Sequence, residues 1–107
     1  MNYRFMRLMV FYDLPFDSKN NIRDYNRFRN NLLSEGFQMM QFSIYTKMCP
    51  NDDSARYAAK RIEKILPSFG NIRLLAITEK QYQKINILRG KKSKQELLID
   101  LRRFLEL

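Results

Sequence analysis

The stretch RFMRLMVFYDL at residues 4–14, followed at once by Pro15, decides the fold class. It is dense in aromatic, β-branched and other apolar side chains on both faces of an extended chain, which is typical of a central, covered strand. Pro15 lacks a backbone N–H, so the strand must end there. Asp13 is therefore predicted at the C-terminal end of a buried strand, where functional sites recur because a rigid backbone opens onto solvent.

Two amphipathic helices are predicted downstream of this strand. The first follows Asp17 and Ser18, either of which could cap it, and its apolar side chains recur at helical spacing over residues 22–33. Gly36 is well placed to end it. The second helix is marked by apolar side chains at helical spacing over residues 55–66.

The remaining segments favour strands and a short tail. Residues 37–49 alternate, although imperfectly, and contain no Gly, Pro or Asn-Gly turn signal, so the pattern predicts one long strand. Residues 72–78 predict another strand, and residues 85–88 a short fourth one. The tail at residues 95–107 fits a helix, while its last six residues also fit an edge strand. This order predicts an α+β domain with two helices on one face of a small, mostly antiparallel sheet.

Length and composition restrict the class of protein. A chain of 107 residues, 45% of them apolar or aromatic, suits one compact domain. No window approaches about 18 consecutive apolar residues, and no signal peptide is recognised, so we expect a cytoplasmic protein without a membrane span. The single cysteine, Cys49, excludes an internal disulfide and any cysteine-cluster metal site.

The absence of histidine excludes several catalytic chemistries. Ser-His and Cys-His nucleophilic catalysis, zinc held by histidine and histidine proton shuttles are all impossible within this chain. Carboxylate, hydroxyl, Lys and Arg chemistry remains, and Mg²⁺ is compatible with it because this ion prefers oxygen ligands. The net charge of +9 makes nucleic acids the leading class of partner.

Asp13 is the leading candidate for catalysis, because it is the only acid in the first strand. The alternative is a strand-end carboxylate that hydrogen-bonds to the backbone. One carboxylate holds Mg²⁺ weakly, but the same residue doubled across a two-fold axis could hold it. Asp52 and Asp53 resemble a metal-binding pair, but their place directly before a helix favours N-terminal capping.

Basic residues on both predicted helices are candidates for nucleic-acid binding. They are expected to contact the phosphate backbone with weak sequence preference, although solvated helix faces are normally charged as well. The candidates are Arg23 and Arg27 on the first helix and Arg56, Lys60 and Lys64 on the second.

Six aromatic residues could stack on bases, as on single-strand binding platforms, although most aromatic side chains at alternating strand positions simply belong to the core. They are Tyr3, Phe5, Phe11, Tyr12, Phe16 and Phe42.

Four ordered motifs resemble the CRISPR-associated protein two family, as it is found in type II systems. They are MRLMVFYDLP at 6–15, FRNNLLSEGF at 28–37, QFSIY at 41–45 and GNIRLLAITEKQY at 70–82. The resemblance implies a ferredoxin-like βαββαβ sandwich over residues 1–90, with residues 91–107 as a C-terminal extension of the same domain. It also implies that residues 37–49 are a bent pair of strands rather than one strand.

The same resemblance implies a function. It implies a homodimer that bridges CRISPR integrase subunits on double-stranded DNA in the complex that inserts new spacers. Asp13 matches the family's strand-end aspartate, a Mg²⁺ ligand in metal-dependent endonuclease activity, while Gln41 and Ser43 match its Gln-x-Ser stretch. With Tyr12, these two are expected to support the site. RNA and DNA both remain open as cleavage substrates, single-stranded RNA is an alternative partner, and the competing hypothesis is a non-catalytic basic regulator of ferredoxin-like fold that binds RNA or DNA.

Overall fold

The centre of the fold is the strand β1 (Met6–Asp13) in the computed structural model, which describes residues 5–15, 17–93 and 96. β1 pairs antiparallel with β3 (Ile44–Cys49) on one side and with β4 (Asn71–Thr78) on the other. β2 (Gln38–Gln41) pairs antiparallel with β3, so the strand order is β2-β3-β1-β4. The predicted central strand is confirmed.

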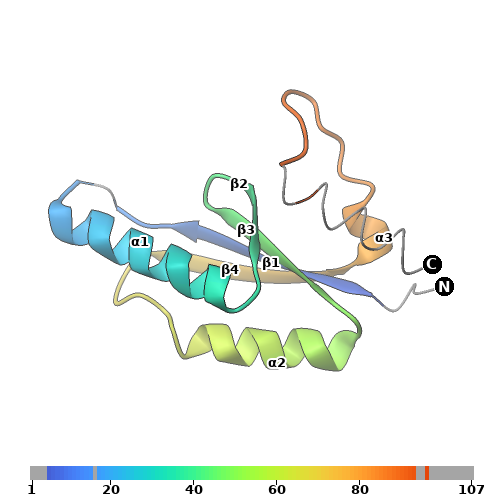
Figure 1. The fold of residues 1–107 in the computed structure, drawn as a ribbon, viewed down its shortest axis with the longest axis horizontal. Coiled ribbons are helices and arrows are strands. Elements are labelled where there is room, and N and C mark those ends of the chain that lie inside the picture. The colour runs from blue at the N-terminus through green and yellow to red at the C-terminus, as the bar shows by residue number, and fades with distance from the viewer. Residues whose placement is uncertain (1–4, 16, 94–95, 97–107) are drawn as a thin grey trace.

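Two helices cover one face of this sheet (Figure 1). α1 (Lys19–Ser34) begins where the Ser18 hydroxyl accepts a hydrogen bond from the Asn21 N–H, and Gly36 follows its end in a left-handed conformation. α2 (Asp52–Glu63) is capped by the Asn51 side chain. The predicted capping by the Asp52–Asp53 pair is therefore wrong in detail. Both aspartates lie inside the first turn, where they favour the helix through its dipole.

The core lies between β1 and the two helices. Alternate β1 side chains, Leu8, Val10 and Tyr12, point toward the helices and are buried against α1 and α2. Each fully buried aliphatic side chain stabilises the fold by about 1.5–3 kcal/mol. The helix residues buried in the same cluster are Tyr25, Phe28 and Leu32 of α1 and Ala55, Ala58 and Ile62 of α2.

The segment at residues 37–49 is a hairpin, and the expectation of one long strand is wrong. β2 ends at Gln41, Phe42 and Ser43 form the turn, and β3 begins at Ile44. Ser43 has a φ of +65°, in the left-handed region that glycine or asparagine usually occupies in turns. Neither turn residue is Gly, Asn or Asp, so no local signal marks the turn. The pair of strands implied by the family resemblance is confirmed.

The chain after β4 also differs from the expectation. A short helix, α3 (Glu79–Tyr82), begins at Thr78, whose hydroxyl forms a capping box with Gln81. Residues 85–88 form no strand, because α3 leads the chain away from the edge of β4 to line a hollow beside the end of β2. The predicted tail, residues 95–107, lies outside the described residues except for residue 96.

The element order βαββαβ, with four antiparallel strands and α1 and α2 on one face, is a ferredoxin-like fold. The predicted α+β class is therefore confirmed. Within the described residues, no helix has both the length and the apolar character needed to cross a bilayer.

Candidate active site at the end of β1

Asp13 is the last residue of β1, and its side chain is exposed. Strand alternation places Asp13 with Arg7, Met9 and Phe11 on the face of the sheet that α1 and α2 do not cover. Asn71, at the start of β4, lies directly opposite Asp13 in the register. The carboxylate is thus presented at the open end of the central strand, as the sequence predicts.

A hollow of about 490 Å³ surrounds this end of β1. Asp13 supplies the carboxylate of this hollow and Arg73 a cation, because both belong to neighbouring antiparallel strands. A phosphodiester placed here would meet a metal-binding oxygen and a positive charge together. The residues that line the hollow are Phe11, Tyr12, Asp13, Phe42, Ser43, Ile44, Asn71 and Arg73.

The backbone at Asp13 is held from two sides. On one side, the Tyr12 N–H donates a hydrogen bond of 3.1 Å to the Ser43 carbonyl. On the other, Gly70 passes so close that an added Cβ would lie 3.0 Å from the Asp13 carbonyl oxygen and 2.2 Å from Leu14 Cδ2. Gly70 also has a φ of +102°, which L side chains rarely adopt. These contacts fix the backbone from which the Asp13 side chain projects.

The donor set at Asp13 fits a hydrated Mg²⁺ ion. The described residues contain no group of three or more His, Cys, Asp or Glu side chains that could enclose a metal. Mg²⁺ commonly keeps several waters and takes one or two carboxylates together with substrate phosphate oxygens. Asp13 supplies one carboxylate and Asn71, its neighbour across the strands, an amide oxygen.

The three residues predicted to support the site lie in different places. The Tyr12 ring is buried against Tyr25 and Phe28, at centroid distances of 5.1 and 5.2 Å, and burial raises the pKa of its phenol far above the ordinary value. Ser43 lines the Asp13 hollow, and its hydroxyl is 3.1 Å from the Tyr25 hydroxyl. Gln41 instead lines a separate hollow beside the segment that follows α3. The structure therefore brings only Ser43 and the Tyr12 backbone to Asp13.

Residues 6–85 match the family model described as CRISPR associated protein Cas2. The chain belongs to the Cas2 family.

Relatives agree with this membership, and a solved structure agrees with the fold. A protein of Ligilactobacillus salivarius named CRISPR-associated endoribonuclease Cas2 is 47% identical over 90 residues, which are 84% of this chain and 89% of the relative. One of the same name from Campylobacter jejuni is 42% identical over 81% of this chain and 61% of its own length. A crystal structure titled as Cas2 superposes with a TM-score of 0.55 at 16% identity, covering 84% of this chain and 92% of its own, which supports the fold.

The predicted nucleic-acid residues of this Cas2 chain lie away from Asp13, on the exposed sides of α1 and α2. Arg56 forms ion pairs with Asp52, at 3.7 Å, and with Asp53, which reduces the charge that it offers to a phosphate. Lys60 and Lys64 form no ion pair within the described residues. The basic residues and the carboxylate therefore occupy opposite faces of the sheet.

The sequence analysis missed Arg73 and Asn71 as residues of the site. Both lie in or beside the predicted strand at residues 72–78, and only the register of β4 against β1 places them near Asp13. A signal existed, because Arg73 interrupts an otherwise apolar run with a charge. The pairing partner of that strand, however, cannot be read from local pattern.

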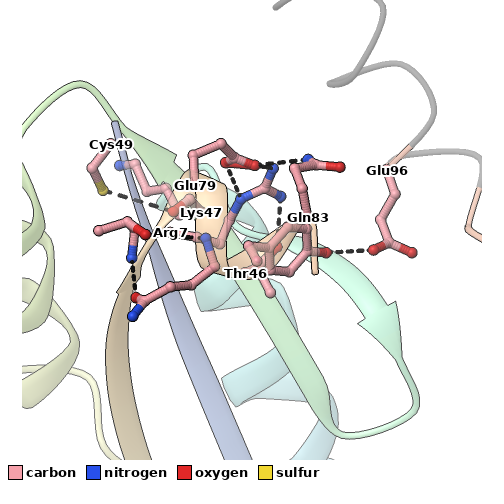
Figure 2. Close-up of polar contacts among 10 residues, drawn as sticks. Arg7, Thr46, Lys47, Cys49, Glu79, Gln83 and Glu96 are labelled. Carbon is pink, nitrogen blue, oxygen red and sulfur yellow. Dashed lines mark hydrogen bonds and ion pairs between the residues drawn. The ribbon is translucent and has the colours of Figure 1, made fainter. Parts of the chain in front are cut away.

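A second charged cluster was also missed, at the other end of β1. Figure 2 shows the buried Arg7 guanidinium between Glu79 and Thr46. Its Nε donates to Glu79 Oε2 at 3.0 Å, and the group lies 3.9 Å from the centroid of the Tyr82 ring. Gln83 donates to the same carboxylate at 3.0 Å. This buried cation is fully partnered, so we assign it a structural role.

Proposed function

We propose that this Cas2 chain is an endoribonuclease that cleaves RNA in the presence of Mg²⁺, with Asp13 as the ligand of the metal. The observation that carries the proposal is an exposed carboxylate, on a rigid strand end, that shares a hollow with Arg73. Relatives named endoribonucleases, at 47% and 42% identity, support it. Asp13 is the one acid among the described residues that line the hollow.

The two charged residues of the hollow have roles that their chemistry suits. Mg²⁺, when bound, lowers the pKa of a coordinated water and offsets charge that develops on the phosphate. Asp13 would hold this ion through its carboxylate. Arg73 would hold a phosphate oxygen through charge-assisted hydrogen bonds and so orient the backbone of the RNA.

A homodimer completes this site. The open face of the sheet carries apolar groups that the helices leave uncovered, including half-buried Phe11 and Ile44 and half-exposed Leu75. Burial of this face against a second copy would remove the apolar surface from water. A two-fold axis near the C-terminal end of β1 would also bring the two Asp13 carboxylates together, because Asp13 lies at that end of the same face. Two carboxylates hold Mg²⁺ better than one.

The deciding experiment replaces Asp13 with asparagine, which retains the shape and removes the charge. Asp13→Asn should reduce Mg²⁺-dependent cleavage of a labelled single-stranded RNA by at least about a hundredfold. Because Asp13 is exposed, the free energy of unfolding should change by less than about 0.5 kcal/mol. Glu63→Gln is the matched control, since it removes the same charge from an exposed position at the end of α2. Undiminished cleavage by Asp13→Asn would refute the proposal.

A second function, on double-stranded DNA, is favoured by the basic helix layer. We infer that the dimer also bridges integrase subunits on duplex DNA during spacer acquisition. A dimer formed through the open sheet faces would turn α1 and α2 outward on both sides, with exposed Arg23, Lys60 and Lys64 available to phosphates. Arg27 is also exposed, but its Nη1 lies 4.0 Å from Asp24 Oδ1, which reduces the charge that it offers. The net charge of +9 supports the same partner.

Salt dependence tests the second function. The logarithm of duplex affinity should fall with the logarithm of salt concentration, with a slope of about −0.9 for each phosphate contact. Reversing Lys60 and Lys64 to glutamate should weaken binding and flatten the slope, and reversing Arg23 and Arg27 should do the same for the other helix. An affinity indifferent to both double variants would exclude the helix layer. Size-exclusion chromatography with an integrase subunit, with and without duplex, tests the bridging itself.

A further inference from the structure

Phe42 is an exposed aromatic residue at the rim of the Asp13 hollow. Its side chain is 67% exposed, although phenylalanine is usually buried, and it lines the same hollow as Asp13 and Arg73. The sequence left two interpretations open for Phe42, a core aromatic or a base-stacking one, and its exposure excludes the core. It lies in the turn between β2 and β3, outside the alternation of either strand.

The exposed ring is held in place by buried groups. It stacks on the ring of Tyr25, with a centroid distance of 5.6 Å and an interplanar angle of 19°. Tyr25 is itself buried in the core, and its hydroxyl is 3.1 Å from the Ser43 hydroxyl. Ser43 adopts its unfavourable φ of +65° directly after Phe42, and its carbonyl accepts the hydrogen bond from the Tyr12 N–H. The ring position is thus fixed relative to Asp13.

An aromatic ring of this kind matches the chemistry of one ligand class. A nucleobase has a flat π-face, and proteins bind single strands by stacking such faces on aromatic side chains beside a cationic path for the backbone. Arg73 supplies the cation and Asp13 the metal-binding oxygen in the same hollow. Bases inside a duplex are already stacked and paired, so their faces are not available to Phe42.

We propose that Phe42 stacks on the base next to the phosphodiester at Asp13, and so makes the site selective for unpaired RNA. This inference rests on the proposed nuclease function and assigns to Phe42 the contact that discriminates unpaired from paired RNA. Phe42 is a specificity residue in this scheme: it contacts a base and leaves the reaction at the phosphate to Asp13 and Arg73.

The test measures stacking directly, without cleavage. A single-stranded RNA that contains 2-aminopurine, a base whose fluorescence is quenched by stacking, is titrated with protein in the presence of EDTA. Phe42→Leu removes the ring and keeps an apolar side chain, and Phe42→Trp restores a ring. Tyr57→Leu is the matched control, because Tyr57 is 65% exposed but lies on α2, on the opposite face of the sheet.

We expect wild-type protein to quench the fluorescence of the single strand. The fluorescence should stay unchanged on addition of protein when the same RNA is paired with its complement, because the base is then already stacked inside the duplex. Phe42→Leu should lose the quenching and bind the single strand about tenfold more weakly, as expected for the loss of one stacked base. Phe42→Trp should restore both, and Tyr57→Leu should behave as wild type.

Three outcomes would overturn the proposal. They are full quenching by Phe42→Leu, an equal loss of affinity for single strand and duplex, and a change of oligomeric state by light scattering, which would place Phe42 in a protein interface. Failure of the nuclease function is distinguishable. Undiminished cleavage by Asp13→Asn would refute that function. It would not affect the quenching experiment, which is done without cleavage.

Discussion

The two ends of β1 carry opposite charges on the same face of the sheet, but only one of these charges is buried. Arg7 at one end is 1% exposed and is surrounded by Glu79, Thr46 and Tyr82. Asp13 at the other end is exposed beside an open hollow. The difference arises from α3, which follows β4 and covers only the Arg7 end (Figure 1). A charge that is enclosed and fully paired stabilises the fold, whereas a charge left open on a rigid strand is available to a ligand.

The largest expected effect comes from breaking the enclosed pair. Arg7→Leu would leave the Glu79 carboxylate buried without its cation, and we expect a loss of about 3–5 kcal/mol in the free energy of unfolding. Denaturant unfolding followed by circular dichroism measures it. The double variant Arg7→Leu, Glu79→Leu should recover much of this loss, because no buried charge then remains. If the double variant were as unstable as the sum of both single variants, the pair would not act as a unit.

A smaller loss in the free energy of unfolding is expected from replacing Gly70, the glycine that packs against the backbone at Asp13. Gly70→Ala should destabilise the fold by about 2–4 kcal/mol, because the new Cβ would meet Leu14 and the backbone would be strained. Gly90→Ala is the matched control, since Gly90 has a similar φ of +100° with open space around it, and it should lose only about 1–2 kcal/mol. Equal losses for the two variants would show that the close approach at Asp13 is unimportant.

The smallest effect concerns two tyrosines, one near each end of β1. Burial, as the largest cause, raises the pKa of both Tyr12 and Tyr82, while both phenols ionise near pH 10 in the unfolded chain. The folded state therefore keeps protons that the unfolded state loses. Stability is fully present below pH 10 and falls above it, by up to about 1.4 kcal/mol per pH unit for each group.

At neutral pH, replacing each tyrosine with phenylalanine should affect the free energy of unfolding differently. The Tyr12 hydroxyl has no hydrogen-bond partner within the described residues, so Tyr12→Phe should be neutral or stabilise by up to about 1 kcal/mol. The Tyr82 hydroxyl donates to Glu96, so Tyr82→Phe should destabilise by about 1 kcal/mol. Unfolding curves at pH 7 and pH 11 check both points, and each variant should show a shallower alkaline decline than wild type. A decline unchanged in both variants would mean that other groups cause it.

Local pattern predicted the parts of the fold that depend on local chemistry. The apolar run up to Pro15 located β1 and Asp13, and helical spacing with a Ser18 cap located α1. The hairpin turn could not be predicted, because neither of its residues, Phe42 and Ser43, is Gly, Asn or Asp. The Arg7–Glu79 ion pair could not be predicted from local pattern, because the two residues are 72 positions apart in the chain. For the same reason Arg73 could be assigned to the site only after the strand register was known.

The turn at Ser43 has a consequence for how the protein folds. Its left-handed residue is supported by Tyr25 of α1 and by the Tyr12 N–H of β1, and both are distant in sequence. A peptide that contains only residues 37–49 would lack both supports, so we expect it to remain unstructured in water. The hairpin is therefore not a transferable module. It should acquire its final geometry late in folding, after α1 has docked on β1, because only then does its turn find the groups that hold it.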